Sequence, residues 1–182
     1  LFSALLEKDV DIDMFKLFVA SDFNIRKVIY PAYKQNRQHK AKPPLLRFAR
    51  DYAISELDAF SCNGVEAEDA LHAAKMDLEK NFDNDVIVAY IDSDVPQFEG
   101  TYYNYHYQKK DQDRLHYVSQ EEAVQRFWTK MIAADAKDNI IVKKGIGIKT
   151  AEKILKGQTT HFGAMRVTYA KYLEWFGRNA KM

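Results

Sequence analysis

The chain has 182 residues, enough for one well-buried core and a small additional subdomain. Its composition, 47% hydrophobic and 29% charged, is that of an ordinary globular protein. No apolar run reaches the roughly 18–20 residues that span a bilayer, so we predict no transmembrane helix. The single cysteine, Cys62, excludes an internal disulfide bond and favours a reducing, cytoplasmic location.

The net charge of +1 conceals an uneven distribution of charge along the chain. Residues 26–50 contain eight Lys and Arg and no acid, residues 51–142 contain 19 acids and eight bases, and residues 143–182 contain nine bases and two acids. Such blocks can be ordinary solvated surface. Alternatively, two basic flanks bind phosphate groups around an acidic centre that binds cations. Only the second interpretation expects the acidic side chains to lie close together in the folded protein.

The first half of the chain alternates between predicted strands and helices. Its elements are a buried strand over 14–20, a helix over 45–57, a short strand over 59–62, a helix over 66–80 and a strand over 86–91. The last of these is a continuous apolar run, typical of a strand buried on both faces of a parallel sheet. This alternation indicates an α/β fold.

The second half begins with a predicted hairpin over 101–118, followed by helices. Ser119 and Glu122 form a predicted capping box that opens a helix ending at Ile132. Gly157 and Gly177 are predicted to end two further helices, which start near Thr150 and Phe162. Alternation on a strand explains the tyrosines of the hairpin (102, 103, 105, 107 and 117) better than base stacking does. Trp128, Trp175 and Phe176 are predicted to be core residues.

Acidic residues stand where an α/β fold places its chemistry, at the carboxyl ends of strands. They are Asp22 after the first strand, Glu66, Glu68 and Asp69 at the start of a helix, Asp92 and Asp94 after the strand over 86–91, and Asp135 and Asp138 after a helix. Each group has an ordinary explanation, because acids favour first helical turns, cap turns and occupy solvated loops. We nevertheless expect them to converge without nearby basic partners, which requires cations to neutralise their repulsion.

Carboxylate ligands without Cys or clustered His favour Mg²⁺ or Mn²⁺ over zinc. The five histidines lack ligand spacing and are interpreted as structural or surface residues. No Gly-rich phosphate loop or nucleophile motif is present. A water activated by one metal ion is then the expected nucleophile, with a second ion stabilising the leaving oxygen of a phosphodiester.

Over about residues 14–157 the chain resembles the 5′-nuclease superfamily, because six blocks occur in the order found there. Its short length and brief basic segment resemble the bacteriophage members most. The blocks are SDFNIRK (21–27), YPAYKQNR (30–37), GVEAEDALHA (64–73), VAYIDSD (88–94), ADAKDNI (134–140) and GIGIKTAEKIL (145–155). The superfamily contains flap endonucleases, the 5′-nuclease domains of bacterial DNA polymerases, and bacteriophage 5′–3′ exonucleases and RNase H.

The resemblance implies an α/β fold with a mainly parallel central sheet flanked by helices, a PIN-like 5′-nuclease core over 1–140. It implies a helical arch in the basic region 26–50 and a helix-three-turn-helix that binds DNA over 141–182. The eight acids would hold two Mg²⁺ ions, directly or through water. Lys34 and Arg37 would be catalytic and steer the scissile phosphate. The implied DNA contacts are Arg26, Lys27, Tyr33, Gly145, Gly147, Lys149 and Thr150, with K⁺ at the helix-three-turn-helix.

The implied function is a 5′–3′ exonuclease or flap endonuclease that cuts DNA, or an RNA–DNA hybrid, in replication or recombination. It would be a monomer without a membrane partner, in the cytoplasm of a bacterial or phage-infected cell, and replication proteins would be its protein partners. A PIN-type ribonuclease and a non-catalytic DNA-binding module with a remnant metal site are the alternatives. The GIGIKTA block disfavours the ribonuclease.

Three departures from the superfamily pattern matter. A further metal-binding Asp is expected near the N-terminus of the first strand, so we expect the natural protein to extend further and this chain to bind metal poorly. Asp9, Asp11 and Asp13 are not convincing substitutes. Ala134 stands where the superfamily usually has Gly. About 28 residues separate Arg37 from Glu66, which predicts a short or incomplete arch.

Overall fold

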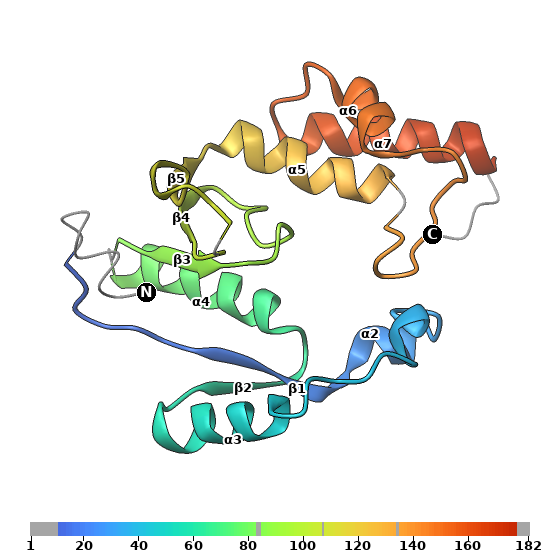
Figure 1. Cartoon of the computed structure of the whole chain (residues 1–182). Coiled ribbons are helices and arrows are strands. Elements are labelled where there is room, and N and C mark those ends of the chain that lie inside the picture. Colours follow the sequence, from blue (N-terminus) through green and yellow to red (C-terminus); the bar gives the residue numbers. More distant parts are fainter. Residues whose placement is uncertain (1–10, 83–84, 107, 134, 178–182) are drawn as a thin grey trace. The chain divides into compact units, whose positions relative to one another are not determined.

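The computed structural model describes residues 11–82, 85–106, 108–133 and 135–177 (Figure 1). The chain divides into two compact units. Unit 1 comprises Leu1–Pro31 and Arg37–Asp85, and unit 2 comprises Ala32–Asn36 and Val86–Met182. The predicted functional division near residue 140 stays a prediction. No helix in the described ranges is long and apolar enough to cross a membrane.

Unit 1 is built around two parallel strands. β1 (Phe18–Asn24) pairs with β2 (Phe60–Gly64), and α4 (Ala67–Phe82) packs against both. In this ladder Ala20 lies beside Cys62, whose side chain is fully buried. The connection between the two strands contains α2 (Ile25–Ile29), the 3-10 turn η1 (Gln35–Arg37) and α3 (Leu46–Glu56).

The first strand begins and ends later than predicted. The ladder of β1 and β2 is irregular between Ala20 and Asn24 and then continues to the pair Asn24–Gly64. Because this last pair extends the strand, Asp22 lies inside β1 and not after it, contrary to the prediction. Its side chain is exposed on the strand.

Unit 2 contains a three-stranded sheet of mixed direction. β3 (Ile87–Tyr90) is parallel to β4 (Gly100–Asn104), and β4 forms an antiparallel hairpin with β5 (Leu115–Val118), as predicted. Tyr102 and Tyr103 are buried, which supports their structural interpretation, whereas Tyr105 and Tyr117 are exposed. The predicted Tyr107 lies outside the described residues. The described strands thus form two small sheets, with parallel pairing in each.

Three helices complete unit 2: α5 (Gln120–Ile132), α6 (Ile148–Leu155) and α7 (His161–Phe176). They pack around a core whose buried members are Val124, Ile132, Ala133, Ala151, Leu155 and Ala164, with Trp128 and Trp175 against it. The predicted capping box of Ser119 and Glu122 is confirmed, and Gly177 caps α7. Phe176 is 46% exposed at the end of α7, so its assignment to the core was wrong.

Candidate functional site

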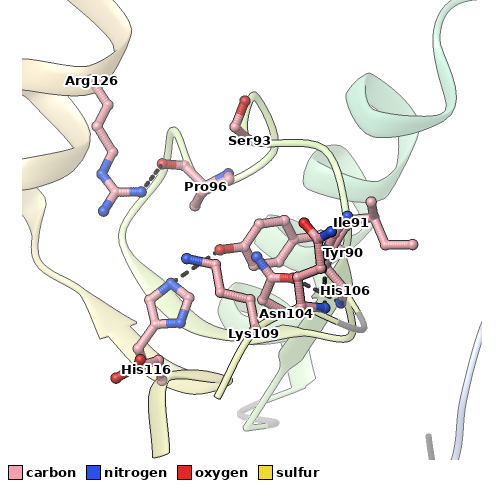
Figure 2. Close-up of a pocket in the computed structure, with 11 residues that line it drawn as sticks. Tyr90, Ile91, Ser93, Pro96, Asn104, His106, Lys109, His116 and Arg126 are labelled. Carbon is pink, nitrogen blue, oxygen red and sulfur yellow. Dashed lines mark hydrogen bonds between the residues drawn. The ribbon is translucent and has the colours of Figure 1, made fainter. Parts of the chain in front are cut away.

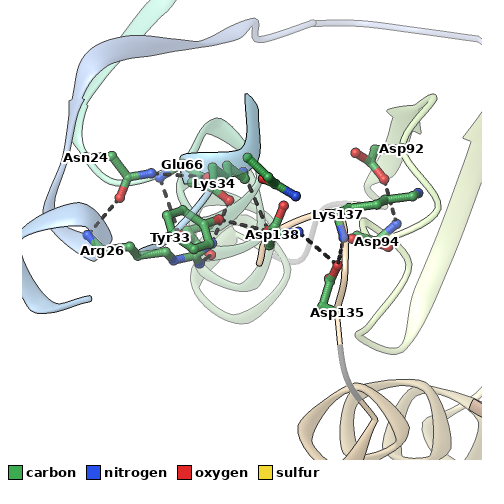
Figure 3. Close-up of polar contacts among 12 residues, drawn as sticks. Asn24, Arg26, Tyr33, Lys34, Glu66, Asp92, Asp94, Asp135, Lys137 and Asp138 are labelled. Atoms are coloured by element: carbon green, nitrogen blue, oxygen red, sulfur yellow. Dashed lines mark hydrogen bonds and ion pairs between the residues drawn. The ribbon is translucent and has the colours of Figure 1, made fainter. Parts of the chain in front are cut away.

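The segment Ala32–Asn36 of unit 2 lies against the loop 135–140 of the same unit. The hydroxyl of the buried Tyr33 donates a hydrogen bond to Asp138 Oδ2 at 3.0 Å (Figure 3). Lys34 Nζ lies 3.7 Å from the same oxygen, and the Lys34 backbone N–H donates to the Asp138 carbonyl at 3.0 Å. Two side chains and one backbone group therefore hold Asp138 in place.

Two side-chain amides reinforce this contact in both directions. Asn139 Nδ2 donates to the Ala32 carbonyl at 2.9 Å, and Asn36 Nδ2 donates to the Ala136 carbonyl at 2.8 Å. Lys34 and Asn139 both have positive φ, +54° and +58°. Such angles are uncommon for lysine and less so for asparagine, and the contacts of this segment help to fix them.

Asp135 organises the same loop from its other end. Its Oδ1 accepts hydrogen bonds from the backbone N–H groups of Lys137 and Asp138, at 2.9 and 3.1 Å. Its backbone pairs with Ile140 in an isolated antiparallel bridge. The two predicted acids are therefore ordered residues, and the interpretation of them as loosely solvated loop residues is disfavoured. Ala134, the predicted departure from the superfamily, lies outside the described residues.

Asp92 and Asp94 follow β3, but the chain turns between them. The Asp94 backbone N–H donates to Asp92 Oδ1 at 3.2 Å, which closes a local turn. The i, i+2 spacing would point both side chains the same way only in an extended chain, and the chain is not extended here. Asp94 Oδ2 forms an ion pair with Lys130 Nζ of α5 at 2.5 Å.

Glu66 and Asp69 of unit 1 face the same guanidinium group. Arg26 Nη1 lies 2.5 Å from Glu66 Oε2, and Arg26 Nη2 lies 2.8 and 2.7 Å from the two Asp69 oxygens. Asn24 Nδ2 donates to Glu66 Oε1 at 3.1 Å, while Asn24 Oδ1 caps α2 through the Arg26 N–H. Glu66 and Asp69 therefore lie on one face at the start of α4. Glu68, half-buried, lies in the first turn of α4.

Asp22 has two basic neighbours on the exposed face of β1. Its Oδ1 lies 2.9 Å from Lys42 Nζ and 3.3 Å from Arg50 Nη1. The hydrogen bond and charge of Lys42, with the charge of Arg50, lower the pKa of Asp22 below its ordinary value of 3.8. Asp22 is therefore ionised throughout the neutral range.

The expectation that the acids lack basic partners is wrong for five of them: Asp22, Glu66, Asp69, Asp94 and Asp138. Lys and Arg side chains at these distances reduce the repulsion between the carboxylates, so metal ions are not required to neutralise it. Each unit contains four of the eight acids. Nowhere in the described ranges do three or more His, Cys, Asp or Glu side chains form a group that could hold a metal ion. The ligand chemistry, hard carboxylate oxygens, nevertheless suits Mg²⁺.

The predicted cationic contacts differ in exposure. Lys27 on α2 and Arg37 at the end of η1 are exposed, whereas Lys34 is half-buried beside Asp138. The guanidinium group of Arg26 is occupied by Glu66 and Asp69. Arg26 therefore has a second, structural use that the sequence did not reveal.

The predicted glycine turn opens α6. Gly145 has φ +85°, and Gly147 is the N-cap of the helix, without a side-chain cap for its first N–H groups. A Cβ atom at either glycine would meet nothing within 4 Å, so the turn faces open space. Lys149 and Thr150 are exposed beside it. This arrangement is a suitable position for a phosphate group.

Two features were not predicted from the sequence. The first is the set of basic partners of the acids, Lys42, Arg50 and Lys130. The second is a pocket beside β3. No motif or spacing connects these bases to their acids, which come from distant segments. Two of the pocket's residues, His106 and His116, were interpreted as structural or surface residues. Both lie in or beside the predicted hairpin, but their separation by ten positions does not indicate that they line one pocket.

The fold is similar to that of a flap endonuclease of known structure. The structure matches the crystal structure of the bacteriophage T5 D15 flap endonuclease, a pseudo-enzyme–product complex with DNA and metal ions, with a TM-score of 0.59. The match covers 95% of this chain and 76% of that chain, at 17% sequence identity. No protein-family model matches the sequence, and no curated protein matches it. At this identity the similarity establishes a shared fold.

Proposed function

We propose that the protein is a Mg²⁺-dependent 5′ nuclease that hydrolyses phosphodiester bonds of DNA, as a 5′–3′ exonuclease or flap endonuclease. The observation that carries this proposal is the fold that 95% of the chain shares with a flap endonuclease whose complex contains DNA and metal ions. The resemblance of the six sequence blocks supports it independently. RNA–DNA hybrids are included among the proposed substrates, and replication or recombination is the proposed setting.

The proposed metal ligands are the acids Asp22, Glu66, Glu68, Asp69, Asp92, Asp94, Asp135 and Asp138. Bound Mg²⁺ supplies Lewis-acid chemistry, which makes water a stronger nucleophile and stabilises the leaving oxygen; Mn²⁺ would substitute. Tyr33 positions Asp138 through its hydrogen bond, and Asp135 shapes the loop that carries Asp138. Arg26 keeps Glu66 and Asp69 close together.

Two sets of residues are proposed to bind the nucleic acid. Lys34 and Arg37 would steer the scissile phosphate, with Lys27 contributing charge from α2. Gly145 and Gly147 would let the duplex backbone approach the N–H groups at the start of α6, beside Lys149 and Thr150. These contacts read the phosphate backbone, so binding would not depend on base sequence. A K⁺ ion at this turn and action as a monomer remain part of the proposal.

A non-catalytic DNA-binding module is the second candidate. The observation that favours it is the pairing of five of the acids with Lys or Arg side chains. In such a module the acids would keep a structural role, and Mg²⁺ would not change the affinity for DNA.

The decisive experiment compares cleavage and binding of end-labelled 5′-flap, nicked-duplex and RNA–DNA hybrid substrates, with Mg²⁺ and with EDTA. The full chain is compared with Asp138→Asn and with Asp51→Asn, an exposed acid on α3, as the matched control. Mg²⁺-dependent release of 5′ products that only Asp138→Asn abolishes supports the nuclease. Binding without cleavage, equal in Mg²⁺ and EDTA, supports the binding module. Absence of both cleavage and binding rejects both candidates.

A further inference from the structure

A polar pocket opens beside the carboxyl end of β3 in unit 2. It has a volume of about 700 Å³, within the range of small-molecule sites, roughly 300–1,000 Å³. Tyr90 and Ile91 line one wall, together with Ser93, the residue between Asp92 and Asp94. The other walls come from the β4–β5 hairpin and from Arg126 of α5 (Figure 2). None of the eight predicted metal ligands is among the described lining residues, but the pocket adjoins the turn that carries Asp92 and Asp94.

The charged side chains that line this pocket include more bases than acids. Lys109 and Arg126 contribute permanent positive charges, and His106 and His116 contribute imidazoles. Asp113 is the one acid among the described lining residues. Neither Lys109 nor Arg126 forms an ion pair with a carboxylate in the described part of the chain; Arg126 Nη1 reaches only the Pro96 carbonyl, at 3.5 Å. Two positive side chains that come from different elements and form no ion pair with the described residues favour a small anion in this concavity.

Other lining groups suit a nucleoside attached to that anion. The ring of His116 stacks against Tyr102 with centroids 6.1 Å apart, and its Nε2 lies 3.4 Å from the Tyr90 hydroxyl. These contacts orient the rings of Tyr90 and His116 in the pocket wall. The side-chain amide of Asn104, in a residue only 6% exposed, is fixed through Oδ1 by the His106 N–H at 2.9 Å. Fixed rings and an amide are the groups that contact and hydrogen-bond a nucleobase.

We propose that this pocket binds a nucleoside 5′-monophosphate, with Lys109 and Arg126 contacting the phosphate and Asn104, Tyr90 and His116 contacting the nucleoside. The ligand is either a free mononucleotide or the 5′-phosphorylated end of a strand. The choice of a nucleotide rests on the proposed function, because a 5′ nuclease both meets such strand ends and releases such products. Binding at the pocket itself requires no cleavage and no metal ion.

The test measures binding of thymidine 5′-monophosphate to the full chain in EDTA, by NMR titration, beside thymidine and inorganic phosphate. We expect the monophosphate to bind more tightly than either fragment. Lys109→Ala and Arg126→Ala should each weaken binding about tenfold, the effect of losing one charge-assisted hydrogen bond. Lys110→Ala, which removes the exposed neighbouring charge outside the pocket, is the matched control and should leave the affinity unchanged.

Several results overturn the proposal: no binding of the monophosphate, thymidine or phosphate binding as tightly, or equal affinities for Lys109→Ala and the control. Competition with 5′-phosphorylated and 5′-hydroxyl oligonucleotides distinguishes the two sources of the ligand. Displacement by the phosphorylated strand alone identifies a strand-end site, and no displacement by either strand identifies a mononucleotide site. EDTA removes metal-dependent cleavage, so nucleotide binding is measured independently of nuclease activity. Nucleotide binding without nuclease activity would reject only the proposed nuclease function. Nuclease activity without nucleotide binding would reject only the proposed nucleotide site.

Discussion

The Tyr33 hydroxyl lies 3.0 Å from Asp138 Oδ2, although 105 positions separate these residues in the sequence. Tyr33 is buried, and the Lys34 amine approaches the same carboxylate oxygen. The contact joins the short segment Ala32–Asn36 to the loop after α5 within unit 2. A residue of the basic region thereby positions one of the acids, so the two motifs form a single structural feature.

Replacing Tyr33 by Phe should lower the free energy of unfolding by about 1.5–3 kcal/mol, because it removes a hydrogen bond to a charged group. Chemical denaturation of the full chain measures this difference. Tyr169→Phe, at an exposed position of α7, is the control and should change stability by less than about 0.5 kcal/mol. Equal stabilities of the two variants would show that the Tyr33 hydroxyl does not stabilise the loop.

Arg26→Gln should make the stability of the protein more responsive to Mg²⁺. Its guanidinium neutralises Glu66 and Asp69, and without it the two carboxylates repel one another. Because the arginine is partly exposed, we expect a loss of only about 1 kcal/mol in EDTA. Thermal unfolding with and without millimolar Mg²⁺ tests whether the cation restores part of this loss. Arg47→Gln, whose partner Asp51 is also exposed, should show neither effect.

The two glycines before α6 should respond differently to alanine. Gly145 has φ +85°, which is unfavourable for an L side chain, whereas Gly147 has φ −102° and ψ 179°, an ordinary extended conformation. Both positions have open space for a Cβ atom, so only the backbone differs. Gly145→Ala should therefore cost about 1 kcal/mol of unfolding free energy through its backbone conformation, and Gly147→Ala should cost less, because it loses only the preference of an N-cap for glycine over alanine. Equal costs would contradict a conformational role for Gly145.

Features with local causes could be predicted from the sequence. Ser119 and Glu122 form their capping box because both partners lie within one helical turn. The β4–β5 hairpin follows from alternating residues on either side of a turn. Gly177 ends α7 because it adopts the positive φ that other residues avoid. In each case neighbouring residues supply all the interactions involved.

Features that depend on distant segments could not be predicted in the same way. Lys42 and Arg50 approach Asp22 through the chain that connects β1 to β2, and no spacing encodes this contact. The extension of β1 through Asp22 depends on pairing with β2 after an irregular register. Lys130 similarly approaches Asp94 because α5 packs near the turn after β3. The sequence shows which residues are acidic. Which Lys or Arg lies beside each acid depends on the tertiary fold.

The thiol of Cys62 should react slowly with thiol reagents in the native protein. Its side chain is fully buried in β2, and burial raises its pKa, so little of the reactive thiolate is present at neutral pH. Because the chain has a single cysteine, the release of thionitrobenzoate from Ellman's reagent reports on this residue alone. The reaction should be rapid only in denaturant. A rapid reaction in native buffer would contradict the burial of Cys62.

Lys42→Gln should raise the pKa of Asp22 towards its ordinary value of 3.8, because the hydrogen bond from Lys42 is the largest cause of the lowered pKa. A carboxyl whose pKa is lowered by folding stabilises the native state above its unfolded pKa. This contribution is lost as the pH falls through the lowered, folded value. The Lys42→Gln variant should therefore titrate Asp22 at higher pH than the natural sequence does, as NMR of the side-chain carboxyl carbon would measure. Lys40→Gln, an exposed change two positions away, should leave the titration unchanged. The same midpoint in all three proteins would mean that Lys42 does not hold Asp22 in solution.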